Sequence, residues 1–120
     1  MTQRPTPRKV RFLLAAALSG VLFLGQLPAA EAAAVSIVET DPNNAGSWKF
    51  EPAELTVKAG ETVTWTHRGS QQHSVSSDTG AFDSGTMTPG QAWSYQFTAP
   101  GEYPYTCTPH PYMTGKVTVT

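Results

Sequence analysis

Cys107-Thr108-Pro109-His110-Pro111-Tyr112-Met113, followed by Thr114-Gly115-Lys116-Val117-Thr118-Val119-Thr120, is the stretch that decides the fold. It places three metal-binding side-chain types directly before an alternating apolar and polar segment. Cys107 is the only cysteine of the chain, so it cannot form an internal disulfide. A thiol, an imidazole and a thioether within seven residues predict a metal-binding loop.

The ligand chemistry of this loop indicates copper. A cysteine thiolate, two imidazoles and a weak axial methionine form the ligand set of a blue-copper electron-transfer site. The loop lacks only the second histidine, for which His67 and His73 are available. We favour His73, which follows a polar loop at the start of a short expected strand. His67 ends another strand, and we expect it to be exposed to solvent.

Alternating apolar and polar residues upstream of the loop predict an all-β domain. The segments are short, turn residues separate them, and no amphipathic helical pattern is present. This spacing is typical of a β-sandwich, here a Greek-key sandwich of seven to eight strands. The expected strands are 34–38, 47–50, 55–57, 62–66, 73–76, 92–98, 103–107 and 115–120.

The first 32 residues have the order of a secretory signal peptide. Four basic residues fall within 1–11, an apolar run occupies 12–24, and Ala30-Glu31-Ala32 fits a small-residue cleavage site. A membrane anchor is the alternative, but the apolar run is short for a spanning helix. We therefore expect a signal peptide at 1–32 and one copper-binding domain at 33–120.

Residues 33–120 carry four basic and eight acidic side chains, a net charge of −4. No basic stripe is present, which argues against nucleic-acid binding. A lone thiol in an oxidising compartment needs protection, and a bond to a metal provides it. The metal also supplements the small core of such a domain.

The upstream residues carry a family resemblance. Phe50-x-Pro52-x-x-Leu55-x-Val57-x-x-Gly60-x-x-Val63-x-Trp65, then His73-Ser-Val, then Phe82-Asp83-Ser84-Gly85, precede the Cys107 loop. This arrangement resembles the cupredoxins, the type 1 blue copper proteins, and most of all amicyanin and bacterial plastocyanin-like proteins. Two residues separate His110 from Met113, as in the short loop of the amicyanin branch.

The resemblance implies one copper ion with His73, Cys107 and His110 as strong ligands and Met113 as the axial ligand. The family usually has asparagine after the first histidine, where it joins the two ligand loops. Ser74 stands there in this chain, and its hydroxyl can still bond to a neighbouring loop, but it offers fewer donors than asparagine.

Pro109 and the surface around His110 are two further predicted features. Pro109 has no N–H to offer the Cys107 sulfur, so we expect a more electron-rich thiolate that favours Cu(II). The family exposes its loop histidine within an apolar patch. The corresponding electron-exit and partner patch here is His110, Pro109, Pro111 and Tyr112.

The function implied is a soluble periplasmic carrier that shuttles single electrons by Cu(I)/Cu(II) cycling. Its expected partners are transient redox proteins, with a methylamine-dehydrogenase-type donor and a c-type cytochrome acceptor. We expect a monomer without a stable membrane anchor. The alternative is a periplasmic protein that sequesters or delivers copper. An enzyme using Cys107 and His110 as nucleophile and base is disfavoured, because it would leave Met113 unexplained.

Overall fold

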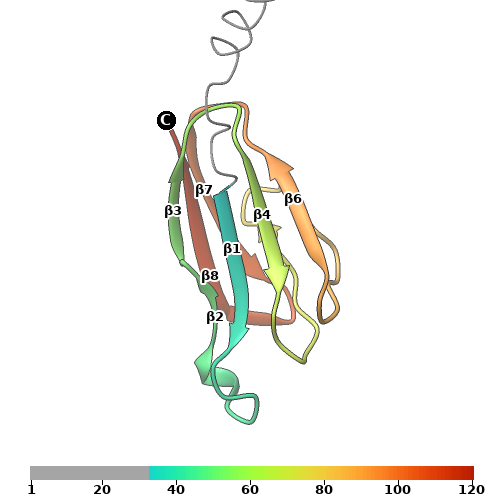
Figure 1. Cartoon of the computed structure of the whole chain (residues 1–120). Helices are drawn as coiled ribbons and strands as arrows, with labels where there is room; N and C mark the ends of the chain where they lie inside the picture. Colours follow the sequence, from blue (N-terminus) through green and yellow to red (C-terminus); the bar gives the residue numbers. More distant parts are fainter. Residues whose placement is uncertain (1–32) are drawn as a thin grey trace, which may run out of the picture. The chain divides into compact units, whose positions relative to one another are not determined.

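The computed structural model describes residues 33–120, which form a sandwich of two four-stranded β-sheets (Figure 1). The expected signal peptide lies outside the described residues. Within residues 33–120, no helix has the length and apolar character needed to cross a membrane. The elements are β1 Ala33–Glu39, η1 Ala45–Ser47, β2 Trp48–Glu51, β3 Glu54–Val57, β4 Thr62–His67, β5 Ser76–Ser77, β6 Ala92–Gln96, β7 Gly101–Cys107 and β8 His110–Val119.

The strand order explains how segments far apart in the sequence meet. One sheet has the order β2-β1-β4-β6 and the other β3-β8-β7-β5. β1 pairs in parallel with β4 and β3 in parallel with β8, whereas the remaining neighbours are antiparallel. The all-β sandwich expected from the alternating pattern is confirmed.

The alternation of β4 shows why these residues form strands. Val63, Trp65 and His67 are buried, while the threonines between them lie on the other face. Opposite faces of a strand alternate with period two, so β-branched and aromatic residues at every second position build one buried surface.

Aromatic side chains from both sheets fill the core. Trp65 of β4 makes an edge-to-face contact with Tyr105 of β7, with ring centroids 5.6 Å apart. Phe50 of β2 meets the same tyrosine at 4.8 Å. Edge-to-face pairs add to the free energy gained by burying apolar area. The strand that ends at Cys107 is therefore anchored by Tyr105 two residues earlier.

Two expected boundaries were wrong. The strand predicted at 73–76 is reduced to Ser76–Ser77, because His73 makes only an isolated bridge with Met87. The last strand, predicted to begin at residue 115, begins at His110. The loop that begins at Cys107 is a tight connection between β7 and β8.

Candidate metal centre

The nitrogen and sulfur atoms of His73, Cys107 and His110 converge at one end of the sandwich. The Cys107 Sγ lies 3.6 Å from His73 Nδ1 and 3.5 Å from His110 Nδ1. The two Nδ1 atoms are 3.2 Å apart. Each side chain directs one donor atom toward a common point, and all three donors lie within 4.8 Å of one another.

The β7–β8 connection positions two of these side chains. Cys107 is the last residue of β7 and pairs with His110, the first residue of β8, next to a bulge between Thr106 and Cys107. A bulge redirects the side chains that follow it. This short connection brings the Cys107 sulfur and the His110 ring together.

A backbone bridge holds the third side chain. The His73 N–H donates to the Met87 carbonyl at 3.2 Å, and the Met87 N–H donates to the His73 carbonyl at 2.7 Å. Met87 is 2 % exposed, and the sequence alone gave no sign of this burial. Its buried side chain anchors the segment that presents His73.

Met113 lies in β8 and is buried in the core. Its neighbour Thr114 is exposed and pairs with Thr106, whereas Cys107 and Met113 are both buried. The strand alternation therefore directs both sulfur-bearing side chains to the interior at the same end of the β7–β8 pair.

Ser74 joins the segment of His73 to the segment of Cys107. Its backbone N–H donates to Cys107 Sγ at 3.4 Å, and its hydroxyl accepts from the Thr108 N–H at 2.8 Å. The hydroxyl also lies 3.0 Å from the Ser76 hydroxyl, which donates to Asp83. The residue that departs from the family pattern thus makes the link between the two segments.

Burial sets the protonation of the cluster when no metal is bound. Burial raises the pKa of the Cys107 thiol, and the Ser74 N–H opposes this only partly. Burial also lowers the pKa of His73, although its hydrogen bond to the Glu39 carboxylate acts in the opposite direction. A neutral imidazole is the form that binds metals.

The donor chemistry fits copper. A buried thiol without a disulfide partner lies against two imidazole nitrogens, and soft sulfur with imidazole is the combination that copper prefers. A metal would neutralise the thiolate that burial otherwise disfavours, because metal binding displaces the proton.

Glu39 is a part of the site that the sequence did not reveal. Its Oε1 lies 2.8 Å from His73 Nε2, and the two side chains are 1 % and 0 % exposed. Burial alone would raise the pKa of Glu39, but hydrogen bonds from Ser70, Gln71 and His73 lower it to about 2. Glu39 ends β1, which runs beside β4, and no local motif marks it.

Trp48 and His67 pack against the rings of the candidate ligand histidines. Trp48 meets the ring of His110 edge-on at 4.9 Å and that of His73 at 5.7 Å, measured between centroids. His67 is 1 % exposed and lies 4.8 Å from the His73 ring, so the expectation of an exposed His67 was wrong. Its Nδ1 accepts from the Gly69 N–H at 3.0 Å, and its Nε2 contacts the Gln71 carbonyl.

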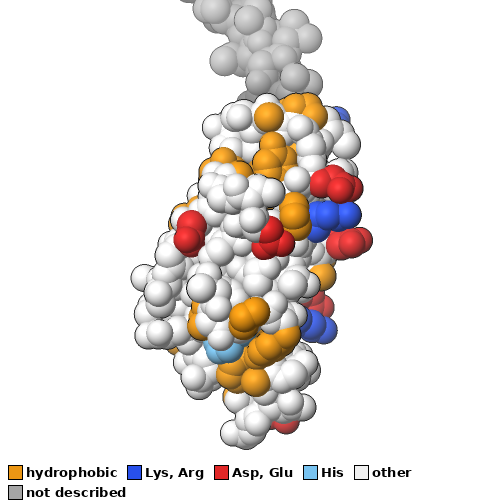
Figure 2. Space-filling view, turned by 180° about the vertical axis from the view of Figure 1, so that it is seen from behind, with side chains coloured by type: hydrophobic (Ala, Val, Ile, Leu, Met, Phe, Trp, Pro, Cys, Tyr) orange, Lys and Arg blue, Asp and Glu red, His pale blue; other side chains and the backbone are white. Residues whose placement is uncertain are grey.

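The surface around His110 is apolar. Tyr112 is 51 % exposed, Pro109 and Pro111 are also exposed, and His110 is the least buried of the three histidines. Figure 2 shows histidine surface with hydrophobic side chains gathered beside it. The sequence-derived patch is therefore contiguous with the metal-binding cluster.

Fold and site together define a class: a β-sandwich with one cysteine, two histidines and a buried methionine at one end. The model of the copper binding proteins, plastocyanin/azurin family, matches residues 37–120. The chain belongs to this family, so its cofactor is copper.

Individual relatives agree with the family assignment. Amicyanin of Paracoccus denitrificans is 46 % identical over 76 residues, which cover 59 % of this chain and 58 % of that protein. Amicyanin-alpha of Methylorubrum extorquens is 35 % identical over 112 residues, covering 89 % of this chain and 92 % of the relative. The chain thus matches less than two thirds of the Paracoccus protein but nearly all of the Methylorubrum one.

A solved structure shares the fold at similar identity. The novel purple cupredoxin from Nitrosopumilus maritimus superposes with a TM-score of 0.66 at 31 % identity, covering 73 % of this chain and 99 % of that chain. The amicyanin-like and cupredoxin-like character expected from the ligand loop is confirmed.

Proposed function

We propose that this protein is a soluble periplasmic type 1 copper protein that carries single electrons between redox partners. His73, Cys107 and His110 are the strong ligands and Met113 is the axial ligand. The observation that carries the proposal is the convergence of the three donor atoms within 4.8 Å. Copper, when bound, supplies one-electron cycling between Cu(I) and Cu(II).

The residues of the chain contribute rigidity. The Met87 bridge fixes His73, the β7–β8 pairing fixes Cys107 and His110, and Ser74 ties both segments together. Side chains held by backbone pairing move little when the charge of the centre changes. Little movement means a low barrier to electron transfer.

The partner surface is the patch of His110, Pro109, Pro111 and Tyr112, in which His110 is half-buried and the other three residues are exposed. A small apolar patch suits a transient redox encounter, because such complexes bury little area. The net charge of −4 for residues 33–120 favours basic or mixed partner surfaces and steers their approach. A c-type cytochrome acceptor and a methylamine-dehydrogenase-type donor fit these requirements, with the protein acting as a monomer.

The location follows from the amino-terminal pattern. Residues 1–32 are proposed as a cleaved signal peptide and residues 33–120 as the exported copper domain. Export to the periplasm places the single thiol in an oxidising compartment, where a copper bond protects it.

Electron exchange tests this function. The copper-loaded protein is mixed with a reduced c-type cytochrome, and the oxidation of the cytochrome is followed in a stopped-flow instrument. We expect fast, reversible exchange that slows at least several-fold in Tyr112→Ala, with the copper absorption band unchanged. Exchange too slow to follow, with copper passing readily to a competing chelator, would favour copper delivery instead.

A further inference from the structure

Glu39 presents a buried carboxylate to the side of His73 that faces away from the Cys107 sulfur. The Glu39 Oε1 lies 2.8 Å from His73 Nε2, whereas His73 Nδ1 lies 3.6 Å from Cys107 Sγ. A carboxylate accepts hydrogen bonds, so the Nε2 carries the proton and Nδ1 keeps its lone pair. The contact therefore selects the ring form whose Nδ1 can bind copper.

The loop between β4 and β5 is built around this carboxylate. Besides His73, the Gln71 N–H donates to Oε1 at 2.8 Å and the Ser70 hydroxyl donates to Oε2 at 2.7 Å. A Cβ on Gly69 would lie 2.4 Å from the Glu39 Oε1, so only glycine leaves room for the carboxylate there. Three hydrogen-bond donors and the space left by the missing side chain of Gly69 hold the Glu39 carboxylate in one position.

Within residues 33–120, no lysine or arginine neutralises the negative charge of Glu39. The Glu39 side chain is 1 % exposed. Nearby charges act strongly when water does not screen them. The charge therefore acts on the adjoining centre through the His73 ring.

We propose that Glu39 is a positioning residue that fixes His73 for copper and lowers the reduction potential by stabilising Cu(II) relative to Cu(I). This inference rests on the proposed function, in which His73 is a ligand. Cu(II) carries one more positive charge than Cu(I), so a buried negative charge stabilises it more. Carboxylates that hold ligating histidines in this way tune metal affinity by about 10- to 100-fold.

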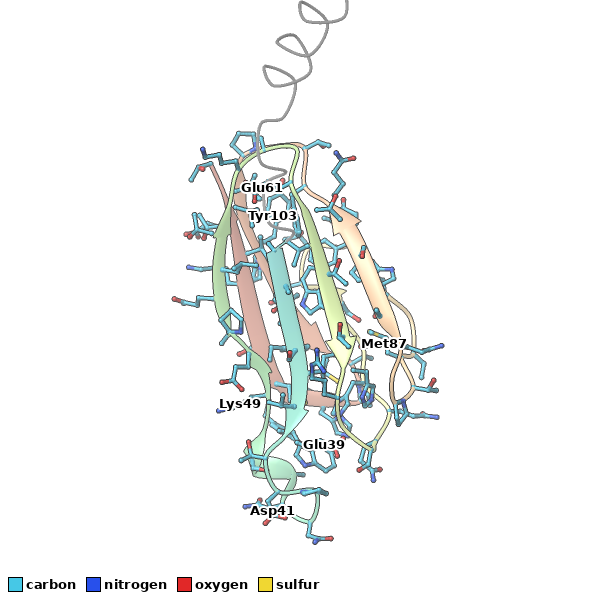
Figure 3. All side chains as sticks on the ribbon, viewed as in Figure 1. Glu39, Asp41, Lys49, Glu61, Met87 and Tyr103 are labelled. Atoms are coloured by element: carbon cyan, nitrogen blue, oxygen red, sulfur yellow. The ribbon has the colours of Figure 1, made fainter. Side chains whose placement is uncertain are left out.

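The test compares Glu39→Gln with Glu61→Gln in the full-length protein. Glutamine keeps the shape of the side chain and removes the charge. Glu61 lies at the opposite end of the sandwich from Glu39, so its variant controls for the net charge (Figure 3). We expect Glu39→Gln to lower the ratio of Cu(II) to Cu(I) affinity about tenfold, which raises the midpoint potential by about 59 mV. Glu61→Gln should stay close to wild type.

Equal midpoint potentials in Glu39→Gln and Glu61→Gln would overturn the role of Glu39. That result would leave the proposed copper function standing. Failure of the wild-type protein itself to form a copper–thiolate band would instead overturn the proposed function. If Glu39→Gln does not fold, as judged by circular dichroism of the apoprotein, Ser70→Ala replaces it. Without the hydrogen bond from the Ser70 hydroxyl, the negative charge of Glu39 acts more strongly on His73. The midpoint potential of the copper centre should therefore fall. An unchanged or higher midpoint in Ser70→Ala would overturn the inference.

Discussion

Replacing Ser74 with alanine tests the link between the two ligand-bearing segments. Ser74 is 4 % exposed, and its hydroxyl accepts the Thr108 N–H at 2.8 Å. The bond from the Ser74 backbone to Cys107 remains in the variant, since it does not involve the side chain. The perturbation is therefore confined to the hydroxyl.

The expected cost follows from the group that loses its partner. A partly buried N–H left without an acceptor costs about 1–3 kcal/mol. The lost contact to Ser76 adds little, because the Ser76 hydroxyl keeps Asp83 and Thr108 as partners. We expect Ser74→Ala to lower the free energy of unfolding of the apoprotein by about 2 kcal/mol.

Urea unfolding of the apoprotein, followed by tryptophan fluorescence, measures this change. Ser94→Ala is the matched control, since its hydroxyl bonds only to Thr64 at the surface. A surface change of this kind stays within about 0.5 kcal/mol. If the two variants lose the same stability, Ser74 does not join the two segments in the way the structure indicates.

Three further predictions concern the core and the ligand loop. Gly115→Ala should destabilise the protein by about 1–3 kcal/mol, because the added Cβ would lie 2.3 Å from the Tyr105 hydroxyl. Thermal unfolding measures this change, and a loss of stability no larger than that of Gly46→Ala would contradict the prediction. Burial raises the pKa of Tyr105 to about 12, so the protein should lose stability as the pH rises from 10 toward 12. Nuclear magnetic resonance titration measures the pKa of Tyr105, and ionisation near pH 10 would contradict the prediction. Pro109→Ala should raise the midpoint potential by adding an N–H near the Cys107 sulfur; voltammetry of the copper protein measures it, and no shift or a downward one would refute the role of Pro109.

Local patterns predicted much of the fold and the candidate ligands. Alternation alone located most strands, since each buries one face against the other sheet. Cys107, His110 and Met113 were recognisable because they lie close together in the sequence and their donor types match one metal. The sequence could also suggest His73, from its place after a polar loop.

Contacts made through the parallel pairing of β1 and β4 could not be predicted in this way. Glu39 is far from His73 in the sequence, and one acidic residue at a strand end is usually solvated. The burial of His67 and Met87 also depends on which loop covers them. These features arise from the tertiary arrangement, and no periodic pattern reports them.

Visible absorption and electron paramagnetic resonance after addition of Cu(II) test the central claim most directly. A Cys107 thiolate bound to copper with His73 and His110 should give an intense thiolate-to-copper band and a narrow copper hyperfine splitting. Both signals should vanish in Cys107→Ser. Wild-type protein that binds Cu(II) with only weak absorption and a wide splitting would contradict the type 1 assignment.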